Sequence, residues 1–387
     1  MIFNKDLLAT AEPPLIYLYK LAQNKREKGI PVIDLGQAIP DMIPDMNSIR
    51  QLYPILEEKK THSYSADLGI KETRRKIAES MNVAEENLII TSGANNAFFQ
   101  VLLLVSRYDD EIIVFSPFYF NHTMAIDMLG RKKRILEMKD SENEWCIDTE
   151  ELRKSINKRT KAVVVVSPNN PTGAVFNKND IERVQEICIE SDIAFIYDEV
   201  YREFYLTDKE RYNPLYLDSS LRNTFIIGSF SKTFGITGWR IGYLIVSSSY
   251  IPELLKIQDT IQICAPVPSQ RFVGEILLNR SPQSNDYRET LIMRRDFLKN
   301  ALLKSRNLVW KSVDGAFFGL FPYKKKIPSQ KLSLELLKTH NIIVVPGAAF
   351  GKNAEFHLRI SFGNADEKIL ANAISIVDNY IEELKNE

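Results

Sequence analysis

The stretch Thr224–Arg240, TFIIGSFSKTFGITGWR, indicates the fold class of this chain. It begins with the apolar run Thr224–Ser229, which is typical of a buried strand. A lysine between hydroxyl-bearing neighbours, Lys232, follows the strand, and an arginine, Arg240, closes the segment. Ligands of open α/β sheets bind at the carboxyl ends of strands, so the segment predicts an α/β fold with a site at this edge.

The polar residues of the segment suit a phosphate ester beside a covalent anchor. Ser229 and Ser231 can donate hydrogen bonds to phosphate oxygens, and Arg240 adds a permanently charged fork of N–H groups. Lys232 can form a Schiff base with an aldehyde. Pyridoxal 5'-phosphate carries both groups on one ring. The segment is therefore interpreted as its anchor, although a single lysine in a loop is more often solvated surface.

Strand-like and helix-like segments alternate through the first two thirds of the chain. The run Ala162–Val166, AVVVV, is typical of a parallel strand buried on both faces. We expect a mostly parallel sheet of about seven strands with helices on both faces. The expected strands are 87–91, 111–116, 134–138, 162–166, 194–198, 224–229 and 242–246, and the expected helices are 94–106, 119–129 and 178–191.

The last third of the chain has the pattern of a smaller α+β domain. We expect strands at 309–313, 317–321, 342–345 and 356–361, and helices at 286–304, 331–339 and 365–384. A helix over 14–28 is expected to pack with this small domain or across a subunit boundary. The predicted division is an N-terminal segment at 1–45, a large cofactor-binding domain at 46–285 and a small domain at 286–387.

Composition and charge exclude several classes of function. Lys plus Arg equals Asp plus Glu at 50 each, which gives no support for nucleic acid or an anionic membrane as partner. The three cysteines and four histidines show no ligand spacing, so we expect no metal site, and His122 is interpreted as packing or surface. No apolar run is long enough to span a membrane and no signal peptide is recognisable, so we expect a cytoplasmic protein.

Small and polar residues also follow the expected strand 87–91. Gly93, Ala94 and Asn95 stand where a helix is expected to begin. Backbone N–H groups at such a position can approach a phosphate, and the helix N-terminus adds positive potential. The alternative is an ordinary helix cap by Ser92 or Asn95.

The pyridine ring of the cofactor has candidate partners after other strands. Asp198 could pair with the ring nitrogen and keep it protonated. Asn170, in the stiff turn Ser167–Gly173, and Tyr201 could contact the 3-oxygen of the ring, and Tyr119 could stack on its face. The structural alternatives are a helix cap for Asp198, a plain loop for Asn170 and buried aromatics for the tyrosines.

Arg359 lies inside the expected apolar strand 356–361. A buried arginine needs an anionic partner, because leaving it unpaired is costly. The α-carboxylate of an amino acid, held by two parallel hydrogen bonds, would serve. The alternative is a structural salt bridge.

The order of these motifs resembles the class I/II pyridoxal phosphate-dependent aminotransferases, which are of fold type I and similar to aspartate aminotransferase. The resemblance covers nearly the whole chain. It rests on Leu35-Gly36-Gln37 with Pro40-Asp41, Tyr64 before Gly69, Ser92-Gly93-Ala94, Asn170-Pro171-Thr172-Gly173, Asp198 with Tyr201, Ser229-Phe230-Ser231-Lys232, Gly238-Trp239-Arg240, and Arg359.

The resemblance implies a reaction and a role for each residue. It implies ping-pong transamination between an L-amino acid and a 2-oxo acid in amino-acid metabolism or biosynthesis, by a homodimer with shared active sites. The implied catalytic residues are Lys232, as Schiff-base lysine and proton shuttle, with Asp198 and Tyr201. The implied cofactor contacts are Gly93, Ala94, Asn95, Tyr119, Asn170, Asp198, Tyr201, Ser229, Ser231, Lys232 and Arg240, with Tyr64 from the neighbouring subunit, and the implied substrate contacts are Arg359, Asn170 and Ala38.

One position departs from the family pattern. Family members usually carry a second glycine after Leu-Gly-Gln, whereas Ala38 stands here, followed by Ile39. A methyl group and a branched side chain would crowd the substrate pocket. Another reaction on the same cofactor, by a C–S lyase, an amino-acid oxidase or a cyclase, is therefore the alternative. A non-catalytic regulator is poorly supported, because the chain has neither spare length nor a basic patch for DNA.

Overall fold

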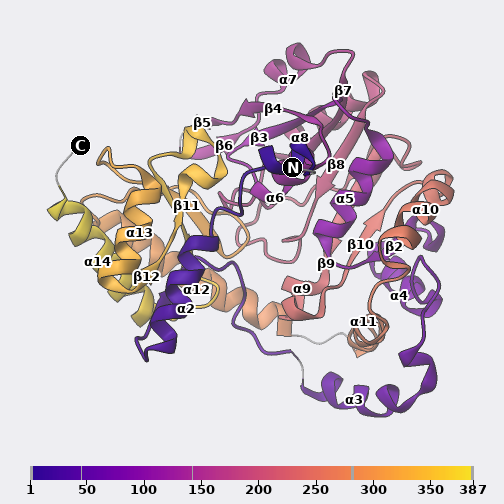
Figure 1. Cartoon of the computed structure of the whole chain (residues 1–387), viewed down its shortest axis with the longest axis horizontal. Helices are drawn as coiled ribbons and strands as arrows, with labels where there is room; N and C mark the ends of the chain where they lie inside the picture. Colours follow the sequence, from indigo (N-terminus) through magenta and orange to yellow (C-terminus); the bar gives the residue numbers. More distant parts are fainter. Residues whose placement is uncertain (1–2, 45, 142, 280–282, 385–387) are drawn as a thin grey trace.

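The computed structural model describes residues 3–44, 46–141, 143–279 and 283–384. Its largest element is a seven-stranded sheet in the order β2-β10-β9-β8-β7-β3-β4, at the centre of Figure 1. The strands are β2 (Leu88–Thr91), β3 (Glu111–Ser116), β4 (Lys132–Glu137), β7 (Thr160–Val166), β8 (Ala194–Asp198), β9 (Thr224–Ser229) and β10 (Gly242–Ile245). Neighbouring strands are parallel except at β10, which is antiparallel to both β2 and β9. The predicted α/β fold class, with its mostly parallel sheet, is confirmed.

Helices cover both faces of this sheet, as the continuous apolar run of β7 predicts. Val163 and Val165 pack in one core with α8 (Lys178–Glu190), whereas Val164 and Val166 pack in another with α5 (Ala94–Val105) and α6 (Phe120–Met128). Successive residues of a strand point to opposite faces, so a strand between two helix layers must be apolar throughout. The other helices of this part are α1 (Lys5–Ala9), α3 (Met46–Glu57), α4 (Lys71–Met81), α7 (Thr149–Ser155), α9 (Phe230–Thr233), α10 (Ile251–Gln262) and α11 (Val267–Asn279).

The last third of the chain forms a smaller group of elements, coloured orange to yellow in Figure 1. A three-stranded antiparallel sheet has the order β11-β14-β13. Its strands are β11 (Phe318–Pro322), β13 (Val345–Pro346) and β14 (His357–Ser361), and its helices are α12 (Gln283–Lys304), α13 (Ser329–His340) and α14 (Glu367–Glu383). The hairpin of β5 (Lys139–Ser141) and β6 (Glu144–Cys146) is a separate antiparallel pair.

The N-terminal residues lie against this smaller group. The helix α2 (Ile16–Glu27) packs beside α13, and β1 (Ile33–Asp34) pairs in parallel with β12 (Ile342–Ile343) (Figure 1). The predicted division into domains stays a prediction, and its first boundary, residue 45, lies outside the described residues.

The expected strand at 309–313 is wrong. Its backbone N–H groups do not bond to one neighbouring strand: Val309 donates to Pro322, whereas Ser312 donates to Asn143. A segment whose hydrogen bonds go to different neighbours cannot form a ladder, although its residues suit a strand. Among the helices of the described residues, none is long and apolar enough to cross a membrane.

Candidate active site

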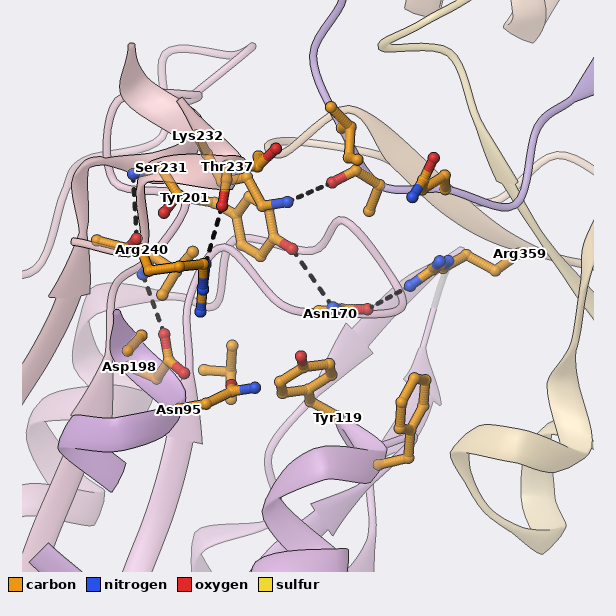
Figure 2. A pocket seen from close by; sticks show the side chains of 18 residues that line it. Asn95, Tyr119, Asn170, Asp198, Tyr201, Ser231, Lys232, Thr237, Arg240 and Arg359 are labelled. Carbon is orange, nitrogen blue, oxygen red and sulfur yellow. Dashed lines mark hydrogen bonds between the residues drawn. The ribbon is translucent and has the colours of Figure 1, made fainter. Parts of the chain in front are cut away.

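A cavity of about 290 Å³ lies at the carboxyl ends of the central parallel strands (Figure 2). It brings together most of the residues predicted for the site. Those that line it are Ala38, Ala94, Asn95, Tyr119, Asn170, Asp198, Tyr201, Ser229, Ser231, Lys232, Arg240 and Arg359. They come from positions scattered between residues 38 and 359, so the tertiary fold, rather than one local motif, assembles the site.

Lys232 lies in the short helix α9, directly after β9. Its Nζ donates a 2.6 Å hydrogen bond to the carbonyl oxygen of Ala38. Burial, together with the positive charges of Arg359 and Arg240, lowers the pKa of Lys232 to about 8. A substantial fraction of this amine is therefore neutral near physiological pH, which is the form that attacks an aldehyde or accepts a proton.

Asp198 is the last residue of β8, and its side chain is buried. One carboxylate oxygen, Oδ1, accepts a 3.0 Å hydrogen bond from the backbone N–H of Val200. The other, Oδ2, lies 3.1 Å from Nε2 of His122. Both oxygens of the carboxylate are therefore held in position.

The sequence-based prediction did not include His122 in the site, because a single histidine is ordinarily part of the packing or of the surface. It lies in α6, stacks on Phe98 at a ring-centroid distance of 4.0 Å, and contacts Asp198. Its position three residues after Tyr119, within the helix expected over 119–129, was an available signal, because residues three apart on a helix share a face.

Asn170 connects two parts of the cavity. Its Nδ2 donates to the hydroxyl of Tyr201 at 3.4 Å, and its Oδ1 accepts a 3.0 Å hydrogen bond from Nη1 of Arg359. Burial raises the pKa of Tyr201, so its hydroxyl stays protonated and can donate to an oxygen placed in the cavity. The neighbouring Asn169 stiffens the turn by accepting from Thr172 Oγ1 at 2.8 Å.

Arg359 lies in β14 and is only 3% exposed. Nη2 donates to the carbonyl oxygen of Gly36 at 2.5 Å, and the guanidinium lies 5.0 and 5.2 Å from the ring centres of Phe318 and Phe350. Its Nε has no hydrogen-bond partner, and no carboxylate of the described chain forms a salt bridge with it. The structural salt bridge, the alternative interpretation of Arg359, is thus not formed among these residues.

A second cluster of donors lies on the opposite side of the cavity from Arg359 (Figure 2). The buried hydroxyl of Ser231 has no hydrogen-bond partner, and the guanidinium of Arg240 contacts the carbonyl oxygen of Thr237 at 3.1 Å. The N-terminus of α5 adds backbone N–H groups, because its cap residue Gly93 provides no side chain to satisfy them. The hydroxyl of Ser229 also lines the cavity, where it caps α9 and donates to Ile241 O at 3.2 Å.

These groups fit pyridoxal phosphate. The unpartnered Ser231 hydroxyl, Arg240 and the start of α5 match a phosphate, and Lys232 matches an aldehyde. The held carboxylate of Asp198 matches a protonated ring nitrogen. The Nε of Arg359, which has no hydrogen-bond partner, is a free donor for a carboxylate on the side of the cavity opposite Arg240 (Figure 2).

Two predicted residues lie outside the lining. Gly93 is adjacent to it: its φ is +85°, and a Cβ added there would lie 2.7 Å from Nη2 of Arg240. Tyr64 is 77% exposed and lies at a separate cavity of about 420 Å³, together with Lys60 and Arg271.

The cavity is also lined by residues that were not assigned to the site from the sequence, namely Gln37, Ile39, Phe120, Val166, Val200 and Thr237. Most are sequence neighbours of assigned residues, which was the available signal. Ile39, Phe120, Val166 and Val200 are apolar, and apolar side chains at such positions are ordinarily part of a core, so their residue type alone does not mark them.

Comparisons with known proteins agree with this geometry. The sequence profile of the family Aminotransferase class I and II matches residues 19–377. The chain is 31% identical over 373 residues to an aspartate aminotransferase of Pyrococcus abyssi, covering 92% of each protein. It is 29% identical over 373 residues to aromatic-amino-acid aminotransferase 2 of Thermococcus litoralis, again covering 92% of each.

A solved structure extends the likeness to the whole fold. A single mutant of Thermus thermophilus aspartate aminotransferase superposes with a TM-score of 0.89 at 26% identity, covering 98% of this chain and 99% of that one. The profile match spans most of the chain, and the elements that build the cavity lie within it. This chain therefore belongs to the class I and II aminotransferases.

Proposed function

We propose that this protein binds pyridoxal 5'-phosphate at Lys232 and transfers the amino group of an L-amino acid to a 2-oxo acid by a ping-pong cycle. The observation that carries the proposal is the environment of Lys232. Its amine, with a pKa lowered to about 8, lies between a cluster of phosphate-type donors and an arginine without an anionic partner. When bound, the cofactor would supply an electron sink for negative charge at the α-carbon of the substrate.

Lys232 would hold the aldehyde of the cofactor and, once displaced by the amino acid, accept the proton from the α-carbon. General bases work best with a pKa near the working pH, which the burial of this lysine supports. Asp198 would pair with the ring nitrogen, and its contact with His122 would keep the carboxylate in place. Tyr201 and Asn170 would contact the 3-oxygen, and Tyr119 would cover the ring.

The two ends of the cavity would bind the two anionic groups. Ser231, Arg240, Ser229 and the start of α5, at Gly93, Ala94 and Asn95, would hold the phosphate. Arg359 would bind the α-carboxylate of the amino acid, since its Nε is free and its guanidinium is already oriented by Asn170. Ala38 would lie beside the substrate, because its carbonyl oxygen contacts Lys232.

The lyase, oxidase and cyclase alternatives are not favoured. The relatives are named as aspartate and aromatic-amino-acid aminotransferases, and nothing in the cavity calls for a different reaction. Aspartate and aromatic amino acids are therefore the first candidates for the amino donor.

A homodimer with shared active sites is part of the proposal. Tyr64 is exposed and lies outside the cavity of its own subunit, which supports a role for it at the phosphate bound by the other subunit. A cytoplasmic location is supported by the three cysteines, all of which are free thiols. Sedimentation of the purified protein would measure its oligomeric state.

The test of the function is a half-reaction. The protein, loaded with pyridoxal phosphate, should show a visible absorbance band, and borohydride reduction followed by peptide mapping should locate the adduct at Lys232. Adding an amino donor without an acceptor should yield one equivalent of aminated cofactor and of 2-oxo acid. Absence of the adduct, or continuous release of ammonia, would contradict the proposal.

A further inference from the structure

A loop of the smaller sheet lies against the end of β3, beside the cavity. It connects β13 to β14 and contains the short helices η6 (Gly347–Phe350) and η7 (Lys352–Ala354). Phe350 is fully buried, and the centre of its ring lies 5.2 Å from Cζ of Arg359. The same ring lies 5.8 Å from the ring of Phe120, which lines the cavity. Phe350 is therefore part of the packing around the proposed α-carboxylate site.

Asn353 fastens this loop to Ser116, the last residue of β3. The Ser116 hydroxyl donates to Asn353 Oδ1 at 2.6 Å, and Asn353 Nδ2 donates to the carbonyl oxygen of Ser116 at 3.0 Å. Nearby, the backbone N–H of Phe118 donates to Phe350 O at 2.9 Å. These three hydrogen bonds join the large sheet to the loop on both sides of Gly351.

The loop and the strand end are in direct contact at Gly351. A Cβ added there would collide with Ser116 Oγ, and the φ of +128° disfavours any side chain. Because no side chain separates the two segments, movement of the loop at Asn353 would also move the backbone of Phe350.

The guanidinium of Arg359 has partners of two kinds. Nη1 donates to Asn170 Oδ1, and Nη2 donates to the carbonyl oxygen of Gly36. The rings of Phe318 and Phe350 are the other partners, at distances over which a cation is attracted to an aromatic face. Phe318 lies in β11, whereas Phe350 lies in the loop, so the position of Phe350 depends on how the loop is fastened.

We infer that Asn353 is a positioning residue for binding of the substrate α-carboxylate. Its two hydrogen bonds to Ser116 hold Phe350 against Arg359, and this contact fixes the orientation in which the guanidinium meets the carboxylate. The inference rests on the proposed function, because it requires Arg359 to bind that carboxylate. It adds to the site a residue that does not line the cavity.

The test compares pairs of ligands that differ only in the α-carboxylate. L-Phenylalanine is paired with 2-phenylethylamine and L-leucine with 3-methylbutylamine, so that the α-carboxylate is the only anionic group. Titration of the visible band of the holoenzyme gives an apparent Kd for each ligand.

Asn353→Ala should raise the apparent Kd of both amino acids by about tenfold, because a small displacement of a binding group is enough for such a loss. It should leave the Kd of the two amines and of pyridoxal phosphate within about twofold. A purely structural role would not separate the amino acids from the amines. Equal changes within each pair, or no change, would overturn the inference.

Asn307→Ala is the matched control. Asn307 is also buried in the smaller group of elements, and its Nδ2 donates two hydrogen bonds, to Asp378 O at 3.1 Å and to Glu382 Oε2 at 2.8 Å. It does not line the cavity. This variant should lower the melting temperature and leave all four ligand Kd values unchanged.

Failure of the inference and failure of the proposed function are distinguishable. If the wild type converts its cofactor with an L-amino acid and Asn353→Ala does not separate the pairs, the aminotransferase assignment stands and the inference is wrong. If no amino acid of a panel converts the wild-type cofactor, the proposed function is wrong and the inference falls with it. Should Asn353→Ala not fold, Ser116→Ala decides, with an expected rise of about threefold for the amino acids alone, because it removes one of the two hydrogen bonds.

Discussion

His122 Nε2 lies 3.1 Å from Asp198 Oδ2, and both side chains are buried. The imidazole comes from α6 and the carboxylate from the end of β8, so the contact joins a helix to the strand edge on which the site is built. Stacking of His122 on Phe98 fixes the plane of the imidazole ring. His122 therefore orients the Asp198 carboxylate, which would pair with the ring nitrogen of the cofactor.

The first prediction concerns this contact. His122→Phe keeps an aromatic ring against Phe98 but removes the partner of Asp198. We expect the Kd for pyridoxal phosphate to rise by about tenfold or more, because a buried hydrogen bond to a charged group is worth about 1.5–3 kcal/mol. Equilibrium dialysis of the cofactor measures this. His340→Phe, in the distant α13, is the control, and equal affinities in wild type and His122→Phe would contradict the role.

Lys232→Ala should abolish turnover while leaving the fold and phosphate binding nearly intact. The loss should be about 10²–10⁴-fold or more, because the general base is removed together with the covalent anchor. Steady-state assays measure the loss of turnover, and circular dichroism checks that the fold is retained. Lys256→Ala, at an exposed lysine of α10 that pairs with Glu253, should retain full activity. Full activity in Lys232→Ala would refute the assignment.

The lowered pKa of Lys232 predicts how stability depends on pH. In the unfolded chain this lysine titrates near about 10.4, whereas in the folded protein its pKa is about 8. Between these values the unfolded state binds more protons, so stability rises with pH. Below about pH 8 both states are protonated, and the folded state carries the full cost of a buried charged amine.

Lys232→Met should therefore stabilise the cofactor-free protein below about pH 8. The gain should shrink as pH rises above 8 and vanish near about pH 10.4. The difference in melting temperature between variant and wild type, followed across this range, measures the effect. A difference that does not change with pH would show that the charge of Lys232 is not its cause.

Arg359→Leu should raise the melting temperature of the ligand-free protein and abolish binding of amino acids. The guanidinium is buried without a carboxylate partner, and burial lowers its pKa. We expect removal of this desolvated charge to outweigh the loss of its hydrogen bonds to Asn170 and Gly36. Thermal denaturation and substrate titration are the two measurements. Arg74→Leu is the control of opposite sign, because Arg74 is paired with Glu85 at 2.8 Å and its loss should destabilise the protein. A lower melting temperature for Arg359→Leu would contradict this account.

Gly93→Ala should weaken binding of the cofactor, because it should disturb the site that holds the cofactor phosphate. A methyl group there would lie 2.7 Å from Arg240 Nη2, and the φ of +85° disfavours any side chain. We expect Arg240 to be displaced and the Kd for free phosphate and for pyridoxal phosphate to rise together. Gly238→Ala offers a control in the same region, since a Cβ at Gly238 would meet nothing within 4 Å. Equal losses in the two variants would rule out this steric cause.

Much of the fold could be predicted from local patterns. The apolar runs that became β3, β8 and β9 were predicted with their observed ends, because a strand between two helix layers must be apolar on both sides. The placement of polar residues directly after these runs also predicted which edge of the sheet carries the cavity. The segment 309–313 failed because strand-forming residues do not make a strand without a neighbour to pair with.

The sequence by itself determined the hydrophobic periodicity that distinguishes helices from strands, the order of the motifs and the kinds of chemical group available to the site. These properties are local, so they can be read from neighbouring residues. Only the tertiary structure decided that His122 meets Asp198, that Arg359 lacks a carboxylate partner in the described chain, and that the Lys232 amine meets the carbonyl oxygen of Ala38. Each of these depends on contacts between residues far apart in the chain, such as β1 with β12, and the free energy of such contacts comes from packing that no local pattern specifies.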